Sequence, residues 1–303
     1  MTEININEKL SLPTAAALGI FDGVHLGHRR VVSEAVRYAG EKHIHAAVFT
    51  FNTSSVTTKG RLESLMTDAQ KKRVLGELGI EYLLATDFPP LRDMTAEQFV
   101  SEILVGCMNV KCAVCGDDFR FGKGGTADCN ELARLCAQHG IETITVPQLK
   151  IGGEPVSSTR IRELIKSGGI ARAGALMGGR FGFELPVVHG FSRGHTWGFP
   201  TINQELPENV VKPRFGVYCS KALVEGRWIA GVTNIGVKPT VEDRSPPLAE
   251  TFLIDYHGNL YGKTIRVELY EFIRPEMKFK DFEHLKAEIG RNTEFAKNFF
   301  GVE

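Results

Sequence analysis

The chain has 303 residues, which is enough for two domains of about 150 residues each. Its 36 Lys and Arg balance its 36 Asp and Glu, so composition indicates no basic surface for nucleic acid or anionic membranes. Apolar residues form 43% of the chain, no apolar run approaches the about 20 residues of a membrane span, and the N-terminus lacks a secretory signal pattern. We therefore expect a cytoplasmic protein.

The first half of the chain alternates predicted strands with predicted helices. We expect strands at 15–20, 45–51, 81–86, 111–115 and 142–146, and helices at 29–41, 68–78, 95–105 and 130–139. This alternation predicts a parallel α/β sheet with ligands at the carboxyl ends of its strands. The glycine fingerprint of dinucleotide-binding folds is missing after the first strand, which counts against a nicotinamide-dependent oxidoreductase.

The turn after the first strand carries the most informative motif, GIFDGVHLGH at 19–28. His25 and His28 stand three residues apart between a predicted strand and a predicted helix. Such a turn gathers backbone N–H groups, a helix N-terminus and two imidazole donors, which suits the phosphates of a nucleotide. The alternative is that two surface histidines lie near a turn by chance.

A second motif, VSSTRIR at 156–162, opens another predicted helix. Its hydroxyls and guanidiniums form a candidate phosphate-binding set, namely Ser157, Ser158, Thr159, Arg160 and Arg162. The alternative is an ordinary Ser/Thr helix cap with solvated arginines. The two motifs together favour a nucleotide site.

Cys112 and Cys115 imitate half of a zinc site. They fall in a predicted strand, where side chains three apart point to opposite faces, so we expect them to fill the core. All six cysteines are expected to be free thiols in a reducing cytosol.

The second half of the chain predicts a different fold. Glycines cluster between 168 and 182, where we expect a short helix at 170–177 and then a hinge. Strands are expected at 185–189, 216–224, 227–234, 250–255 and 264–272, with a closing helix at 281–299. Strands without intervening helices predict an antiparallel barrel. Thr201 and Asn203, two apart in an extended segment, share one face and suit Mg²⁺ carrying ATP phosphates; the alternative is a turn with ordinary hydrogen bonds.

With these motifs in this order, the chain resembles the bifunctional bacterial riboflavin kinase/FAD synthetase family from about residue 17 to about residue 300. The matching segments are 19–28, 114–122 (VCGDDFRFG), 156–162, 198–203 (GFPTIN), 231–241 (GVTNIGVKPTV), 250–255 (ETFLID) and 274–279 (RPEMKF). The resemblance implies an α/β adenylyltransferase domain with a Rossmann-like parallel sheet at 1–168 and a linker at 169–184. A mostly antiparallel β-barrel riboflavin kinase domain with a C-terminal helix would follow at 185–303.

The resemblance also implies roles for individual residues. In the first domain, His25 and His28 would donate to the α-phosphate of ATP, while Ser157, Ser158, Thr159 and Arg160 hold the β- and γ-phosphates and Arg162 extends the positive rim. Gly19, Phe21, Asp22 and Gly23 would belong to the nucleotide turn, and Asp118 and Asp128 to polar positions around nucleotide and flavin. In the second domain, Thr201 and Asn203 would bind Mg²⁺, Glu250 would accept the proton of the riboflavin 5′-hydroxyl, Arg274 would lie near the flavin and Gly194 would let backbone approach phosphates.

One departure from the family pattern concerns the loop after the second strand. Residues 50–55 read TFNTSS where the family reads TFxPHP, so Ser54 stands in place of a histidine and both prolines are lost. A hydroxyl cannot supply an imidazolium charge. The kinase segment keeps both metal ligands and the base.

The favoured interpretation is therefore an enzyme that phosphorylates riboflavin to FMN and adenylylates FMN to FAD, using ATP and Mg²⁺. Its partners would be the small molecules riboflavin, FMN, ATP and FAD, with no nucleic acid and no membrane; the sequence leaves the oligomeric state open. One alternative is a riboflavin kinase whose first domain only binds or regulates. A flavin-responsive regulator of nucleic acid is disfavoured by the neutral charge. A nucleotidyltransferase for pantetheine or a pyridine nucleotide would explain the histidine motif but not the PTIN barrel.

Overall fold

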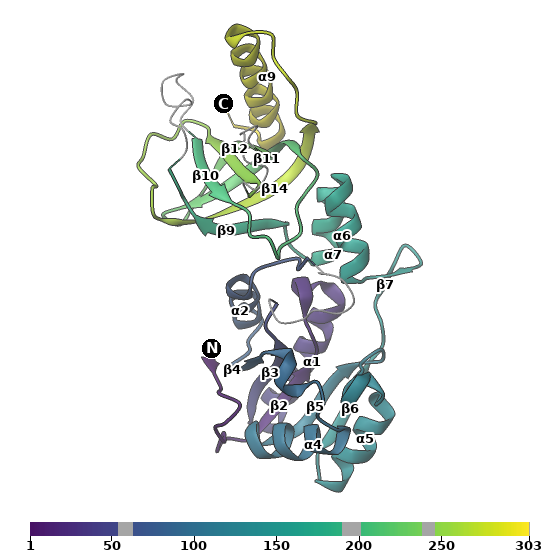
Figure 1. Ribbon diagram of the computed structural model, residues 1–303. Coiled ribbons are helices and arrows are strands. Elements are labelled where there is room, and N and C mark those ends of the chain that lie inside the picture. Colours follow the sequence, from purple (N-terminus) through teal and green to yellow (C-terminus); the bar gives the residue numbers. More distant parts are fainter. Residues whose placement is uncertain (54–62, 190–200, 238–245, 303) are drawn as a thin grey trace. The chain divides into compact units, whose positions relative to one another are not determined.

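The computed structural model describes residues 1–53, 63–189, 201–237 and 246–302 (Figure 1). The chain divides into two compact units, Met1–Ser158 and Thr159–Glu303. The change of unit coincides with the change from alternating strands and helices to a strand-rich chain. Each unit builds its own sheet.

The first unit contains a six-stranded parallel sheet, as the strand–helix alternation predicts. Its strands are β1 (Thr2–Glu3), β2 (Thr14–Leu18), β3 (His45–Phe51), β4 (Tyr82–Thr86), β5 (Val110–Gly116) and β6 (Glu142–Val146). They lie in the order β1-β4-β3-β2-β5-β6. The chain moves outward from β2 through β3 to β4 and then returns to β5, so the strand order reverses between β2 and β5. Open α/β sheets bind ligands at the carboxyl ends of the strands at such a reversal.

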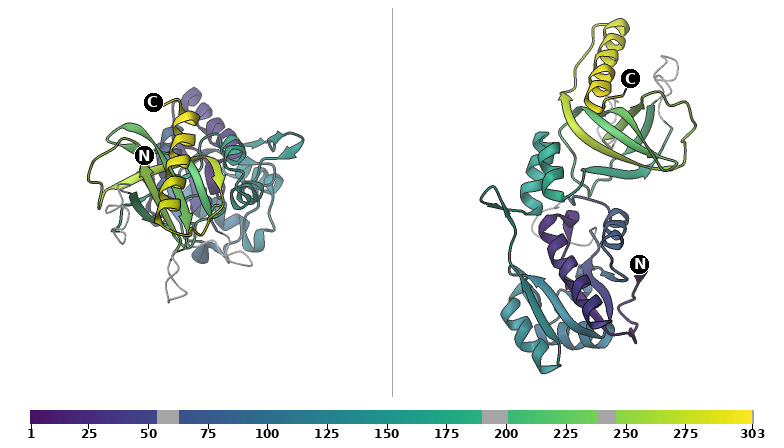
Figure 2. Two further views of the ribbon diagram at one scale, coloured as in Figure 1. Left: turned by 90° about the horizontal axis from the view of Figure 1, so that it is seen from above. Right: turned by 180° about the vertical axis from the view of Figure 1, so that it is seen from behind.

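Helices cover both faces of this sheet (Figures 1 and 2). Helix α1 (Leu26–Lys42) packs on one face. Short α4 (Ala96–Gln98), the π-helix Phe99–Cys107 and α5 (Cys129–Gln138) pack on the other. Alternate residues of β2 such as Ala16 and Leu18 belong to the hydrophobic core between the sheet and this second layer of helices. Ala15 and Ala17 point to the opposite face of the sheet and are also buried. Further elements are α2 (Asp68–Glu77), α3 (Phe88–Leu91), the single turns Asp22–Val24 and Lys123–Gly125, and the hairpin β7 (Lys150–Ile151) and β8 (Glu154–Pro155).

The predicted helix at 95–105 is only partly an α-helix. Beyond Gln98 the chain widens into the π-helix, whose end is marked by the 2.9 Å hydrogen bond from the Met108 N–H to the Ile103 carbonyl. Residue pattern alone does not separate these two helix types, because both bury an apolar face.

The described residues of the second unit form two helices, six antiparallel strands and a closing helix. The helices α6 (Ser158–Ser167) and α7 (Ile170–Met177) come first, followed by β9 (Gly182–Pro186), β10 (Thr201–Glu205), β11 (Gly216–Val224), β12 (Arg227–Gly236), β13 (Leu248–Leu253) and β14 (Thr264–Arg274). The order β10-β13-β12-β11-β14-β9 is antiparallel throughout. An isolated bridge between Val188 and Asn203 brings the two edges together, so the sheet forms a nearly closed barrel as predicted. Helix α9 (Phe282–Phe300) packs on its outer face.

The strand predicted at 185–189 begins earlier than expected, at Gly182. Gly182 pairs with Glu268, and a Cβ at Gly182 would collide with the Val267 carbonyl. This glycine therefore permits a close strand approach. The segment 169–184 accordingly holds α7 and the first residues of β9; the domain limits at 168 and 185 stay a prediction.

Candidate functional site

The histidine motif lies at the carboxyl end of β2, where the strand order reverses. Between β2 and α1 the backbone is unusual, since Phe21, Gly23 and Val24 have φ of 50°, 80° and 37°. A β-branched residue such as Val24 rarely adopts positive φ, and each such residue costs about 1–3 kcal/mol. A turn of this kind persists only when its surroundings hold it firmly.

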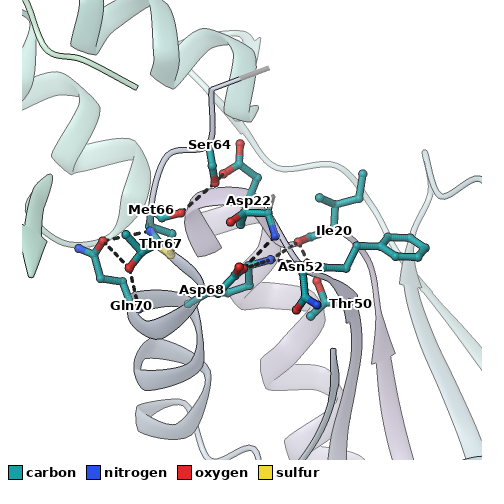
Figure 3. A network of polar contacts seen from close by, with 12 residues as sticks. Ile20, Asp22, Thr50, Asn52, Ser64, Met66, Thr67, Asp68 and Gln70 are labelled. Carbon is teal, nitrogen blue, oxygen red and sulfur yellow. Dashed lines mark hydrogen bonds and ion pairs between the residues drawn. The ribbon is translucent and has the colours of Figure 1, made fainter. Parts of the chain in front are cut away.

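Side chains from three elements, β3, α1 and α6, hold the carbonyls of this turn. The Ile20 carbonyl accepts from the Thr50 hydroxyl of β3 at 2.8 Å (Figure 3). The Asp22 carbonyl accepts from the Ser158 hydroxyl at 2.9 Å, and the Val24 carbonyl accepts from Arg29 Nε at 3.1 Å. The predicted phosphate-binding residue Ser158 thus contacts the histidine turn directly.

The Asp22 side chain anchors the same turn from another direction. Its carboxylate accepts from the Ser64 hydroxyl at 2.9 Å and from the Leu65 N–H at 2.7 Å (Figure 3). A Cβ added to Gly23 would lie only 2.5 Å from Leu65 Cδ1. Gly23 is therefore required both by its positive φ and by this close contact.

His25 and His28 are stacked, with ring centroids 3.6 Å apart and an interplanar angle of 15°. His25 Nδ1 accepts the His28 backbone N–H at 3.3 Å, so in the neutral ring we assign the proton to Nε2. Burial lowers the pKa of His25 to about 4; burial, followed by the charges of His25 and Lys71, holds the pKa of His28 well below its ordinary value. Both rings are therefore neutral donors at the N-terminus of α1.

A buried nitrogen of His28 and a groove beside α1 are further features of this region. Within the described residues His28 Nδ1 is buried without a hydrogen-bond partner. A groove of about 530 Å³ runs beside the start of α1 to the end of β6, and its lining residues are Leu26, Arg29, Arg30, Ser33, Glu34, Arg37, Val146 and Leu149. Neither histidine lines this groove, and its Arg37 is paired with Glu34 and Glu41.

The remaining residues predicted for the nucleotide site come from several elements. Phe21 meets His28 edge-on, with centroids 5.4 Å apart, and a Cβ at Gly19 would touch the Phe21 ring at 3.1 Å. Asp118 follows β5 and is exposed. Ser157 precedes α6, which carries Thr159, Arg160 and Arg162 in the second unit.

Asp128 is the N-cap of α5. Its carboxylate accepts from the N–H groups of Asn130 and Glu131, both at 3.0 Å, and these bonds lower its pKa. Capping accounts for an aspartate at this position without a ligand.

In the second unit, one row of paired residues crosses five strands. Asn203 of β10 pairs with Glu250 of β13, Glu250 with Asn234 of β12, Asn234 with Val217 of β11, and Val217 with Arg274 of β14. Directly paired residues of antiparallel strands point to the same face. The row therefore brings the predicted Asn203, Glu250 and Arg274 onto one face and adds Asn234, which the sequence interpretation did not single out.

Asn203 carries an oxygen that is available for a ligand. Its side chain is 5% exposed, and its amide nitrogen donates to the Thr201 carbonyl at 3.3 Å. In the described part of the chain Asn203 Oδ1 is buried with no hydrogen-bond partner. A buried acceptor without a donor is costly, and a hard cation such as Mg²⁺ would satisfy it.

Glu276 adds a second carboxylate near Glu250, and sequence reasoning missed it. Burial and the negative charge of Glu250 raise the pKa of Glu276. Its carboxylate lies against Gly236, where any Cβ would collide with it. The signal available in the sequence was the matched RPEMKF segment.

Arg274 is held by α9. Its Nε lies 2.9 Å from the Glu288 carboxylate and donates to Asn292 Oδ1 at 3.3 Å, and the two charged side chains are only 16% and 13% exposed. The C-terminal helix thus fixes the last member of the row. Gly194 and Ser54 lie outside the described residues.

Comparison with known proteins identifies the family. Residues 7–160 match the family model of FAD synthetase, and residues 177–300 match that of riboflavin kinase. The chain belongs to the bifunctional riboflavin kinase/FMN adenylyltransferase family.

Full-length relatives support this membership. The chain is 31% identical to a bifunctional riboflavin kinase/FMN adenylyltransferase of Listeria monocytogenes, over 98% of this chain and 96% of the relative. It is 35% identical to that of Bacillus subtilis, over 94% and 92%.

A solved structure also matches the whole chain. A crystal structure titled as a macrolide-efflux protein from Streptococcus pneumoniae matches with a TM-score of 0.86 and 27% identity over 98% of both chains. None of the helices within the described ranges combines the length and hydrophobicity that a membrane crossing requires.

Proposed function

We propose that this protein phosphorylates riboflavin to FMN and then adenylylates FMN to FAD, each with ATP. The observation that carries the proposal is that predicted site residues lie together in each unit. The stacked neutral histidines lie at the strand-order reversal of the first unit, and one row of the second unit aligns Asn203, Glu250 and Arg274. Both groups of residues fall within the matched family segments.

In adenylyl transfer, a phosphate oxygen of FMN attacks the α-phosphorus of ATP, and the bond from that phosphorus to the bridging oxygen of the β-phosphate breaks. Pyrophosphate leaves with the electron pair. Nucleophile and leaving group are both anionic, so positioning and charge neutralisation dominate the catalysis. His25 and His28, as neutral donors beside the N-terminus of α1, would stabilise the charge that develops on the α-phosphate oxygens.

The remaining nucleotide contacts follow from the same turn. The groove along α1 would take the nucleoside part of ATP, with Arg29 and Arg30 on its wall. We propose Ser157, Ser158, Thr159, Arg160 and Arg162 as ligands of the β- and γ-phosphates, since Ser158 bonds the turn and the others flank it in sequence.

In the kinase reaction, the riboflavin 5′-hydroxyl attacks the γ-phosphorus of ATP, and ADP leaves. Glu250 would accept the hydroxyl proton as general base. Burial and the negative charge of Glu250 raise the pKa of its neighbour Glu276, because two close carboxylates disfavour a second charge. Asn203 Oδ1 and the Thr201 hydroxyl would hold Mg²⁺, which when bound neutralises phosphate charge.

Two matched variants test the assignment of the two reactions. Glu250→Gln should lower the rate of FMN formation from riboflavin about 10²-fold or more. The rate of FAD formation from added FMN should stay unchanged. His28→Asn should do the reverse. If either variant lowers both reactions equally, or neither, the assignment of the reactions to these residues is wrong.

A second candidate function is a riboflavin kinase whose first unit binds nucleotide without turnover. The observation that favours it is the TFNTSS sequence at 50–55, which lacks the histidine of the family pattern. Release of pyrophosphate with FAD from FMN and ATP would exclude this candidate.

A further inference from the structure

Lys71 of α2 is a buried lysine beside the histidine turn. Its side chain is 3% exposed. Its Nζ donates to the Phe51 carbonyl at 2.8 Å and to the Ile20 carbonyl at 3.3 Å, and it lies 3.8 Å from an oxygen of the Asp68 carboxylate. An ammonium has three N–H donors, and two of them bond the carbonyls while the Asp68 carboxylate balances the charge.

The two carbonyls belong to the ends of neighbouring parallel strands. Phe51 is the last residue of β3, and Ile20 comes two residues after the end of β2. The same Ile20 carbonyl accepts from Thr50, and Asp68 accepts the Thr53 backbone N–H at 2.9 Å (Figure 3). One buried ammonium and its counterion therefore tie the histidine turn to the chain that leaves β3.

The donors of Lys71 point into the protein, so its effect on a bound phosphate is exerted through the turn and through its charge. That charge contributes to lowering the pKa of His28. Burial lowers the pKa of Lys71 itself, while Asp68 and Asp22 act in the opposite direction. The ammonium thus fixes the turn and contributes to the lowered pKa of His28.

We propose that Lys71 is a positioning residue for adenylyl transfer, because its ammonium fastens the strained turn to the end of β3 and so places His25 and His28. This inference rests on the proposed role of the histidine pair. It adds to that role a residue that acts on the histidines through the turn that carries them. The neighbouring Lys72 differs, because it is 45% exposed and pairs with Glu3.

The test compares Lys71→Met with Lys72→Met in the full chain, since the two changes remove the same charge from adjacent positions of one helix. For Lys71→Met we expect the kcat of FAD formation from FMN to fall about 10²-fold, the scale expected when reacting groups are misplaced by about 1 Å. Lys72→Met should stay within about 2-fold of the parent, and both variants should keep the riboflavin kinase rate.

A second readout separates positioning from simple loss of structure. NMR titration of the labelled imidazoles should show a higher pKa for His28 in Lys71→Met, because a neighbouring positive charge is gone. In Lys72→Met the His28 titration should be unchanged. If Lys71→Met is folded and forms FAD at the parent kcat, or if its His28 titration does not move, the inference is wrong.

Two outcomes keep this inference distinct from the proposed function. If FAD formation survives His28→Asn, the histidine pair is not the adenylylation site, and the assignment on which this inference rests fails. If the parent protein forms no FAD from FMN and ATP, the proposed function itself fails. If Lys71→Met unfolds the first unit, Lys71→Arg replaces it, because a planar guanidinium keeps the charge but cannot meet the three acceptors in the same geometry. We then expect a kcat at least about 10-fold below the parent, and an unchanged kcat overturns the inference.

Discussion

Replacing Gly23 by alanine would strain the histidine turn at one point while keeping its polar groups. Gly23 has a φ of 80°, and a Cβ there would lie 2.5 Å from Cδ1 and 3.1 Å from Cβ of Leu65. Leu65 is fully buried, and its N–H is bonded to Asp22, so it cannot withdraw freely. Left-handed backbone costs alanine about 1–2 kcal/mol and overpacking a further 1–3 kcal/mol, so we expect a loss of about 2–5 kcal/mol from the first unit.

Gly140→Ala is the matched control. Gly140 has a φ of 66°, and among the described residues nothing comes within 4 Å of its Cβ position. This variant therefore carries the backbone cost alone, about 1–2 kcal/mol, far along the chain from the turn. The difference between the two variants isolates the contact with Leu65.

The two units can be followed separately. Both tryptophans, Trp197 and Trp228, fall in the second unit, so tryptophan fluorescence reports only its unfolding. Backbone hydrogen exchange in β2 and β3 reports the first unit. Gly23→Ala should speed that exchange and lower FAD formation at least about 10-fold, with kinase rate and fluorescence transition unchanged. If it matches Gly140→Ala in both exchange and FAD formation, the account of the turn is refuted.

Three further predictions follow from the two sites. Burial lowers the pKa of His25 from 6.5 to about 4, so the unfolded state binds a proton more readily than the folded state as the pH falls. The first unit should therefore lose about 3 kcal/mol of its free energy of unfolding between pH 6.5 and pH 4. In His25→Asn the stability of this unit, followed by hydrogen exchange, should depend less steeply on pH. Glu288→Gln should cost the second unit about 2 kcal/mol by fluorescence and lower the kinase rate, since it removes the carboxylate that holds Arg274. Asn203→Ala should raise the Mg²⁺ concentration for half-maximal kinase rate about 10-fold or more; an unchanged value would contradict the proposed ligand.

Periodic sequence patterns predicted much of the fold. The strands predicted at 45–51, 142–146 and 216–224 agree residue for residue with β3, β6 and β11. Such strands can be predicted because each is a short apolar run whose ends are marked by neighbouring residues of the sequence. The π-helix after Gln98 and the early start of β9 could not be predicted. Both depend on hydrogen bonds and close approaches that the assembled structure decides.

The candidate sites show the same division. The histidine turn was predicted because strand, glycines and helix are contiguous in the sequence. The family resemblance named Asn203, Glu250 and Arg274 for the kinase site, but their alignment in one row depends on strand register, which no local pattern encodes. Lys71 and Lys72 are adjacent and chemically identical, and only the docking of α2 determines which of them is buried.

The central claim is that one chain carries out two consecutive reactions. The most direct measurement is a time course of purified protein with riboflavin, ATP and Mg²⁺, in which flavins are separated by chromatography and pyrophosphate is quantified. We predict that FMN rises first, that FAD then accumulates, and that one pyrophosphate is released for each FAD. FMN alone, without pyrophosphate, would contradict adenylyl transfer at the histidine turn, and the absence of both flavin products would contradict the account of both units.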